Sequence, residues 1–134
     1  MSKDKATKPD TARTTEPLTR AIARFDLGSE AASLRNEEPR PVGGHRARTL
    51  IKHSDFRIVL ISLEAGANLH EHKVDHSFSL QALTGHVRLQ LPSETVDLQA
   101  GNMLVLDKGI PHDLEALEES TVLLTISWSK KHKA

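Results

Sequence analysis

From His45 to Trp128 the chain consists of short apolar runs separated by Gly, Pro, Asp and Ser. Apolar and polar residues alternate within several runs, as in the segment HVRLQL that begins at His86. A period of two predicts half-buried β-strands, and many short strands at this spacing are typical of an antiparallel sandwich or barrel. The pattern therefore predicts an all-β domain with these strands: Ala47–Lys52, Phe56–Leu63, Leu69–His72, Ser77–Leu83, His86–Leu91, Thr95–Leu98, Met103–Leu106, His112–Leu117 and Thr121–Trp128.

The beginning of the chain has a different pattern. Residues 1–18 are rich in Lys, Thr, Asp and Pro and have little to bury, so we expect a disordered tail. Residues 19–44 are expected to form an arm and linker, in which Ser29 favours the start of a short helix running through Leu34. We expect the arm to pack on the domain or on a partner subunit. The barrel domain is expected to span residues 45–129, and residues 130–134 a basic tail.

Composition limits the chemistry. The 134 residues fit one small domain, and without cysteine any metal must be held by His, carboxylate or water. The 18 Lys and Arg balance 18 Asp and Glu, and only three Phe and one Trp are present, which argues against a nucleic-acid partner. No apolar run approaches the length of a membrane span, and the N-terminus lacks an apolar signal core, so we expect a cytoplasmic protein without a membrane partner.

The eight histidines are the main candidates for chemistry. His70 and His72 lie two residues apart on a predicted strand, so both imidazoles are expected on one face, as a half-site for a divalent metal. His86 alternates with the apolar Val87 that follows it, so their side chains are expected on opposite faces of the strand. The same alternation predicts these side chains on the outer face: Gln81, His86, Asp113 and Glu115.

Two spaced segments resemble the motifs of the cupin family. Gly66–Gly85 contains a Gly, the His-x-His pair and a strand that runs to a Gly turn, and Gly101–His112 matches the second motif with Gly109 in register. Asp107 stands where that motif usually has Pro. The resemblance covers about residues 45–127 and implies a small single-domain, cupin-2-like jelly-roll β-barrel. It also implies that the motif histidines face the interior and bind a metal, namely His70, His72 and His112.

The sequence departs from the family at one ligand position. Typical cupins have a Glu or Gln after the His pair, and counting forward from His72 puts this position at His76, whereas counting back from Gly85 puts it at Phe78. An inward His76 would complete a four-imidazole site, which suits zinc, nickel or copper better than manganese. With Phe78 there instead, three histidines would leave open positions for water or substrate. If neither arrangement supplies ligands, the histidines only line a pocket.

These observations predict a cupin-domain protein that binds a divalent metal (Zn, Ni, Fe, Mn or Cu) through interior histidines, with a small-molecule ligand of unknown identity. The alternatives are a non-catalytic ligand-binding or regulatory cupin whose metal site is vestigial and empty, and a structural role. No catalytic residue is assigned and enzymatic turnover is left open, because the chain has no Tyr and Glu71 and Asp113 are expected to point outward. The apolar strand Thr121–Trp128 and the arm predict a homodimer.

Overall fold

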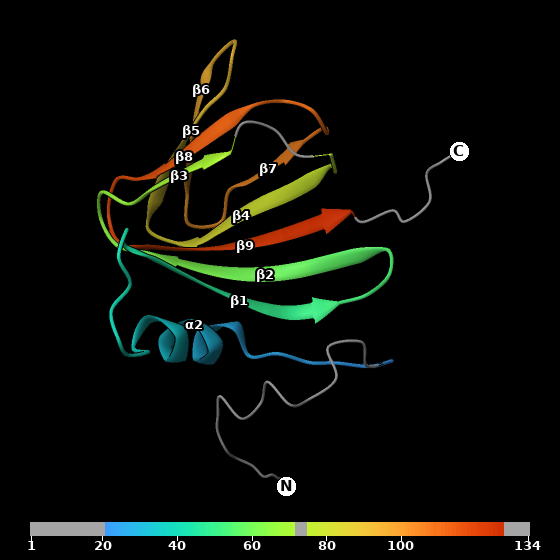
Figure 1. The fold of residues 1–134 in the computed structure, drawn as a ribbon, viewed down its shortest axis with the longest axis vertical. Coiled ribbons are helices and arrows are strands. Elements are labelled where there is room, and N and C mark those ends of the chain that lie inside the picture. Colours follow the sequence, from blue (N-terminus) through green and yellow to red (C-terminus); the bar gives the residue numbers. More distant parts are fainter. Residues whose placement is uncertain (1–20, 72–74, 128–134) are drawn as a thin grey trace, which may run out of the picture.

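The structure is a computed structural model that describes residues 21–71 and 75–127. Two β-sheets stack face to face, one with strand order β1-β2-β9-β4-β7 and the other with order β3-β8-β5-β6 (Figure 1). Every strand pairing is antiparallel, so the prediction of an all-β antiparallel barrel is confirmed. The strands are β1 His45–Lys52, β2 Phe56–Leu63, β3 Asn68–Glu71, β4 Phe78–Thr84, β5 His86–Gln90, β6 Thr95–Gln99, β7 Met103–Leu106, β8 His112–Ala116 and β9 Ser120–Ser127.

The core lies between the two sheets and follows the alternation of the strands. In β4, Phe78, Leu80 and Ala82 are buried, whereas Ser79 and Gln81 are only partly buried. Strand β8 alternates in the same way, with Asp113 and Glu115 on the outer face, as the sequence pattern predicts. The buried side chains between the sheets are Ile61, Leu63, Ala67, Phe78, Leu80, Ala82, Val87, Leu89, Leu98, Leu106, Leu114, Ala116 and Val122.

The arm contains helix α2, Leu27–Arg35. Asp26 is its N-cap, and the carboxylate of Asp26 accepts a hydrogen bond of 3.2 Å from the backbone N–H of Ser29. The helix therefore begins two residues before Ser29, because Asp at the N-cap satisfies a free N–H of the first turn. Among the described residues no helix is long and apolar enough to cross a bilayer.

Helix α2 packs on the outer face of the five-stranded sheet (Figure 1). Ala31 and Leu34 are buried there against Leu50 of β1 and Leu60 of β2. The helix thus forms a second, smaller core on the opposite side of this sheet from the main one.

An arginine on β1 ties the helix to the sheet. The guanidinium of Arg48 pairs with Glu30 within α2 at 3.0 Å and with Glu37 just after it. The Arg48 side chain is only 19% exposed, so these pairs are better shielded from water than ordinary surface ion pairs. The arm consequently packs on its own domain.

Both segments that suggested a homodimer make contacts within a single chain over part of their described residues. The arm packs on β1 and β2, and β9 lies in the middle of its sheet between β2 and β4. Large exposed apolar side chains occur on the edge strand β7, where Met103 is 59% and Val105 65% exposed, and in the arm, where Ile22 is 85% and Val42 100% exposed. The homodimer stays a prediction.

The predictions for the N-terminal tail, residues 1–18, and for the basic tail, residues 130–134, concern segments outside the described residues.

Candidate functional site

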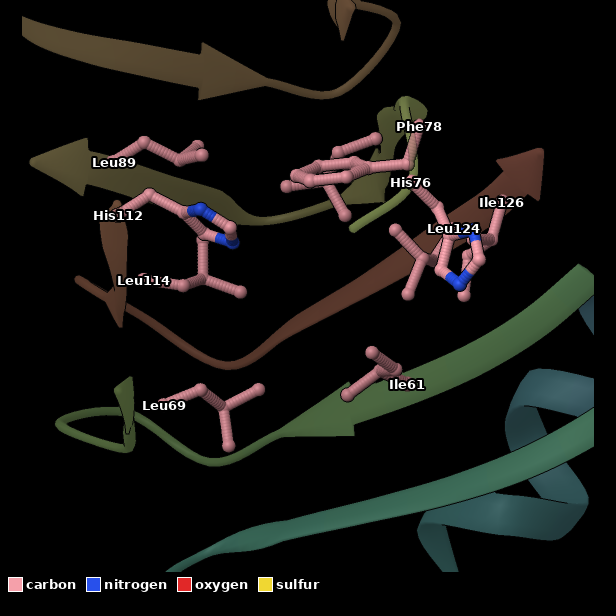
Figure 2. A pocket seen from close by; sticks show the side chains of 10 residues that line it. Ile61, Leu69, His76, Phe78, Leu89, His112, Leu114, Leu124 and Ile126 are labelled. Carbon is pink, nitrogen blue, oxygen red and sulfur yellow. The ribbon is translucent and has the colours of Figure 1, made fainter. Parts of the chain in front are cut away.

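A cavity of about 270 Å³ lies between the two sheets (Figure 2). Its walls come from strands β2, β3, β4, β5, β8 and β9 and from the segment that precedes β4. Eight of the ten lining side chains are apolar and two are imidazoles: Ile61, Leu69, His76, Phe78, Leu80, Leu89, His112, Leu114, Leu124 and Ile126.

His112 is the buried polar side chain of this cavity. It begins β8, is only 9% exposed, and its ring points into the cavity (Figure 2). Its Nδ1 lies 3.0 Å from the carbonyl oxygen of Ile110. A carbonyl can only accept, so Nδ1 donates, and in the neutral ring Nε2 keeps its lone pair. Nε2 of His112 is therefore a hydrogen-bond acceptor whose direction in the cavity is fixed. It can bind a hydrogen-bond donor or a metal ion.

Phe78 lies next to this imidazole. The ring centroids of Phe78 and His112 are 5.1 Å apart, and their planes are inclined by 51°. This is the position that the count from Gly85 assigns to the family carboxylate. The apolar ring of Phe78 thus lies beside His112 where a cupin carboxylate is expected. On this side of His112 the cavity therefore lacks one metal ligand and one negative charge.

His76 also lines the cavity, from the segment before β4. Its side chain is partly exposed, and Figure 2 shows it on the other side of the cavity from His112. The two imidazoles therefore face the same space from separate walls.

The prediction that His70 faces the interior is wrong. In the pairing of β3 with β8, Leu69 lies opposite Leu114 and both line the cavity, so His70, opposite Asp113, projects from the other face. The side chain of His70 is 68% exposed, and its Nδ1 lies 3.1 Å from Oδ1 of Asp113. The carboxylate of Asp113 thus holds His70 on the outer surface, away from His112.

Comparisons with solved structures identify the architecture, although no model of a protein family and no curated protein matches the sequence. A conserved protein of unknown function from Streptococcus pyogenes superposes with a TM-score of 0.67 at 24% identity, covering 84% of this chain and 92% of the other. For an RmlC-like cupin from Shewanella frigidimarina the TM-score is 0.65 at 18% identity, with coverages of 82% and 95%. The chain has the cupin fold.

A larger enzyme shares the architecture over part of its length. Salicylate 1,2-dioxygenase from Pseudoaminobacter salicylatoxidans, solved as adducts with gentisate, superposes with a TM-score of 0.61 at 22% identity. The match covers 74% of this chain and 30% of that enzyme. At these identities the comparisons establish the cupin fold alone. Function has to be inferred from the residues of the site.

The described donors do not make a metal centre in this cupin barrel. Within residues 21–71 and 75–127 no group of three or more His, Asp or Glu is placed to hold one ion. Of the described histidines, His112 and His76 line the cavity, while a catalytic zinc site typically uses three protein ligands. The third histidine of the sequence prediction, His72, lies outside the described residues.

A group of polar side chains formed by His86, Arg88 and Asp97 lies on the outside of the cupin barrel. Nε2 of His86 is 3.4 Å from Oδ2 of Asp97, and the guanidinium of Arg88 donates to both oxygens of the same carboxylate at 2.7 and 3.3 Å. The hydrogen bond from Arg88 holds the pKa of Asp97 below its usual value. The outward prediction for His86 agrees with this contact, and the cluster is separate from the cavity.

The apolar walls of the cavity could not be recognised from the sequence as part of a site. Leu69, Leu124 and Ile126 have the inward strand phase, which by itself also describes ordinary core residues. What distinguishes them is that opposing side chains leave a space between the sheets, and this depends on the three-dimensional packing of six strands. His76, Phe78 and His112 are the lining residues that the sequence had already indicated as candidates.

Proposed function

We propose that this cupin-fold protein binds a small, mostly apolar molecule in the cavity between its sheets. The observation that carries the proposal is the lining of eight apolar side chains around one buried, oriented imidazole, His112. Ligand pockets in proteins are mostly apolar, with a few convergent polar groups that fix orientation. Among the described lining residues no carboxylate, hydroxyl or amine accompanies the two imidazoles, so the polar contacts available to a ligand come from His112 and His76.

The apolar part of the proposal is tested with toluene as the probe. Near ten times its Kd, toluene is expected to raise the Tm of the full chain by about 5 °C, because a ligand that binds only the folded state stabilises it. Leu124→Trp fills the cavity and should abolish this rise. Val105→Trp introduces the same side chain at a position that is 65% exposed and should leave the rise intact. A rise that persists undiminished in Leu124→Trp would contradict binding in the cavity.

A divalent-metal function is the second candidate. The observation in its favour is the hydrogen bond from Nδ1 of His112 to the carbonyl of Ile110, because metal-ligating histidines usually donate their other ring nitrogen in this way. The described donors are too few, so this function also requires His72, with His76 as a further ligand in the four-imidazole version.

Calorimetric titration of tag-free protein with Zn²⁺ tests the metal function. Under this hypothesis one ion binds per chain, and His112→Ala or His72→Ala weakens binding by about 100-fold or more, since a directly bound ligand counts for more than its supporting shell. His70→Ala is the control and should leave the affinity unchanged, because His70 projects from the outer face. Absence of saturable binding, or binding that is indifferent to His112→Ala, contradicts the metal function.

A further inference from the structure

The imidazole of His112 determines which kind of apolar ligand fits the cavity best. Nδ1 of His112 is already used by Ile110, so Nε2 is available as a hydrogen-bond acceptor directed into an apolar space. No Lys, Arg, Asp or Glu occurs among the described residues that line the cavity. A hydrocarbon would leave the buried acceptor without a partner, which costs binding energy, so a ligand that carries one donor fits better.

The size and shape of the cavity favour a single ring. An apolar protein cavity of about 150 Å³ is enough to hold benzene, and the cavity here is about 270 Å³. This leaves room for a six-membered ring with small substituents. The Phe78 ring beside His112 offers an aromatic surface at the acceptor, and aromatic pairs gain energy beyond their buried area.

We propose that the ligand is a neutral monocyclic phenol of about the size of 4-methylphenol, with its hydroxyl donating to Nε2 of His112 and its ring against Phe78. This inference rests on the proposed binding function and specifies its ligand class. A phenol group has a pKa near 10 and is neutral at pH 7, so it enters the cavity without bringing a charge.

Aromatic acids of the same size are disfavoured by the same walls. A carboxylate has only acceptors to offer, and Nε2 of the neutral His112 is itself an acceptor. Transfer of an ionised group into an apolar pocket is costly unless a cation pairs with it. The lining that the structure describes has no Lys or Arg for this purpose.

Three matched probes, toluene, 4-methylphenol and benzoate, test the proposal by calorimetry on the full chain at pH 7.5. We expect 4-methylphenol to bind about five- to tenfold more tightly than toluene, the gain of one hydrogen bond. Benzoate should bind at least about 30-fold more weakly than 4-methylphenol, because its charge is left unpaired.

The His112 acceptor is tested with two variants. His112→Leu removes the acceptor and should make toluene and 4-methylphenol bind equally, while His112→Gln keeps an acceptor oxygen and should restore part of the difference. The wild-type protein provides a readout that does not depend on folding of the variants. In a ¹⁵N-histidine-labelled sample, the Nε2 resonance of His112 should shift with 4-methylphenol and much less with toluene.

The outcomes separate this inference from the function on which it rests. If no probe binds, both the ligand pocket and the phenol class are wrong. Equal binding of toluene and 4-methylphenol to the wild type supports the pocket and overturns hydroxyl recognition by His112. Tighter binding of benzoate also overturns the phenol class, and it would point to a cation at the cavity, for which Arg57, opposite Ile126 in the sheet, is the first residue to replace.

Discussion

Gly85→Ala is expected to destabilise the protein by about 4 kcal/mol or more, in the range that marks a severe steric defect. Gly85 has φ of 85°, and a Cβ added there would lie 2.2 Å from Oγ of Ser120 and 2.3 Å from the carbonyl oxygen of Glu119. It would also lie 2.7 Å from Cα of Ser120, which is fully buried, so a rotamer change cannot relieve the contact. Urea denaturation followed by circular dichroism measures the loss.

Gly101→Ala is the matched control. Gly101 has a similar φ of 93°, but an added Cβ would meet nothing within 4 Å. Only the left-handed backbone penalty remains, about 1–2 kcal/mol. If the two alanine variants lose the same stability, close packing at the Gly85 turn is not what requires glycine there.

Leu34→Ala should destabilise the domain by about 3 kcal/mol, within the range for removing a buried leucine side chain. Leu34 is 1% exposed and packs with Leu50 and Leu60 between helix α2 and the sheet. The same denaturation measurement applies, at two protein concentrations. Because α2 packs on its own chain, the loss should be independent of concentration.

Ile22→Ala is the control for this effect. Ile22 is 85% exposed, so its truncation should change stability by less than about 0.5 kcal/mol. A stability loss for Leu34→Ala that decreases as protein concentration rises would indicate that the arm packs on a partner subunit, contrary to the fold described here.

The strands could be predicted because their signal is local. All nine predicted strands occur, and in strands such as β4 the buried residues follow the alternation of the sequence. Gly66, Gly85, Gly101 and Gly109 mark four of the turns between strands, and each has a positive φ. The start of helix α2 was missed by two residues, since Asp26 and Ser29 are both good N-cap residues and only the fold decides which one serves.

The candidate site could be predicted only in part. A period of two shows which residues share a face of a strand, but the pairing partner decides which face is buried. His70 was assigned to the wrong side because the cupin resemblance was followed there, whereas the alternation that placed His86 outward also puts apolar Leu69 inward and His70 outward.

The contact that orients His112 has a consequence for changing this pocket. The carbonyl of Ile110 lies only two residues before His112, so the anchor and its support form one short segment. The opposing walls come from other strands, with Ile61 on β2 and Leu124 on β9. Wall residues can therefore be exchanged one at a time, by mutation or by selection, to admit rings of different size while the direction of the acceptor stays fixed. Under the proposed binding function, a barrel arranged in this way can change its ligand in small steps without rebuilding its polar contact.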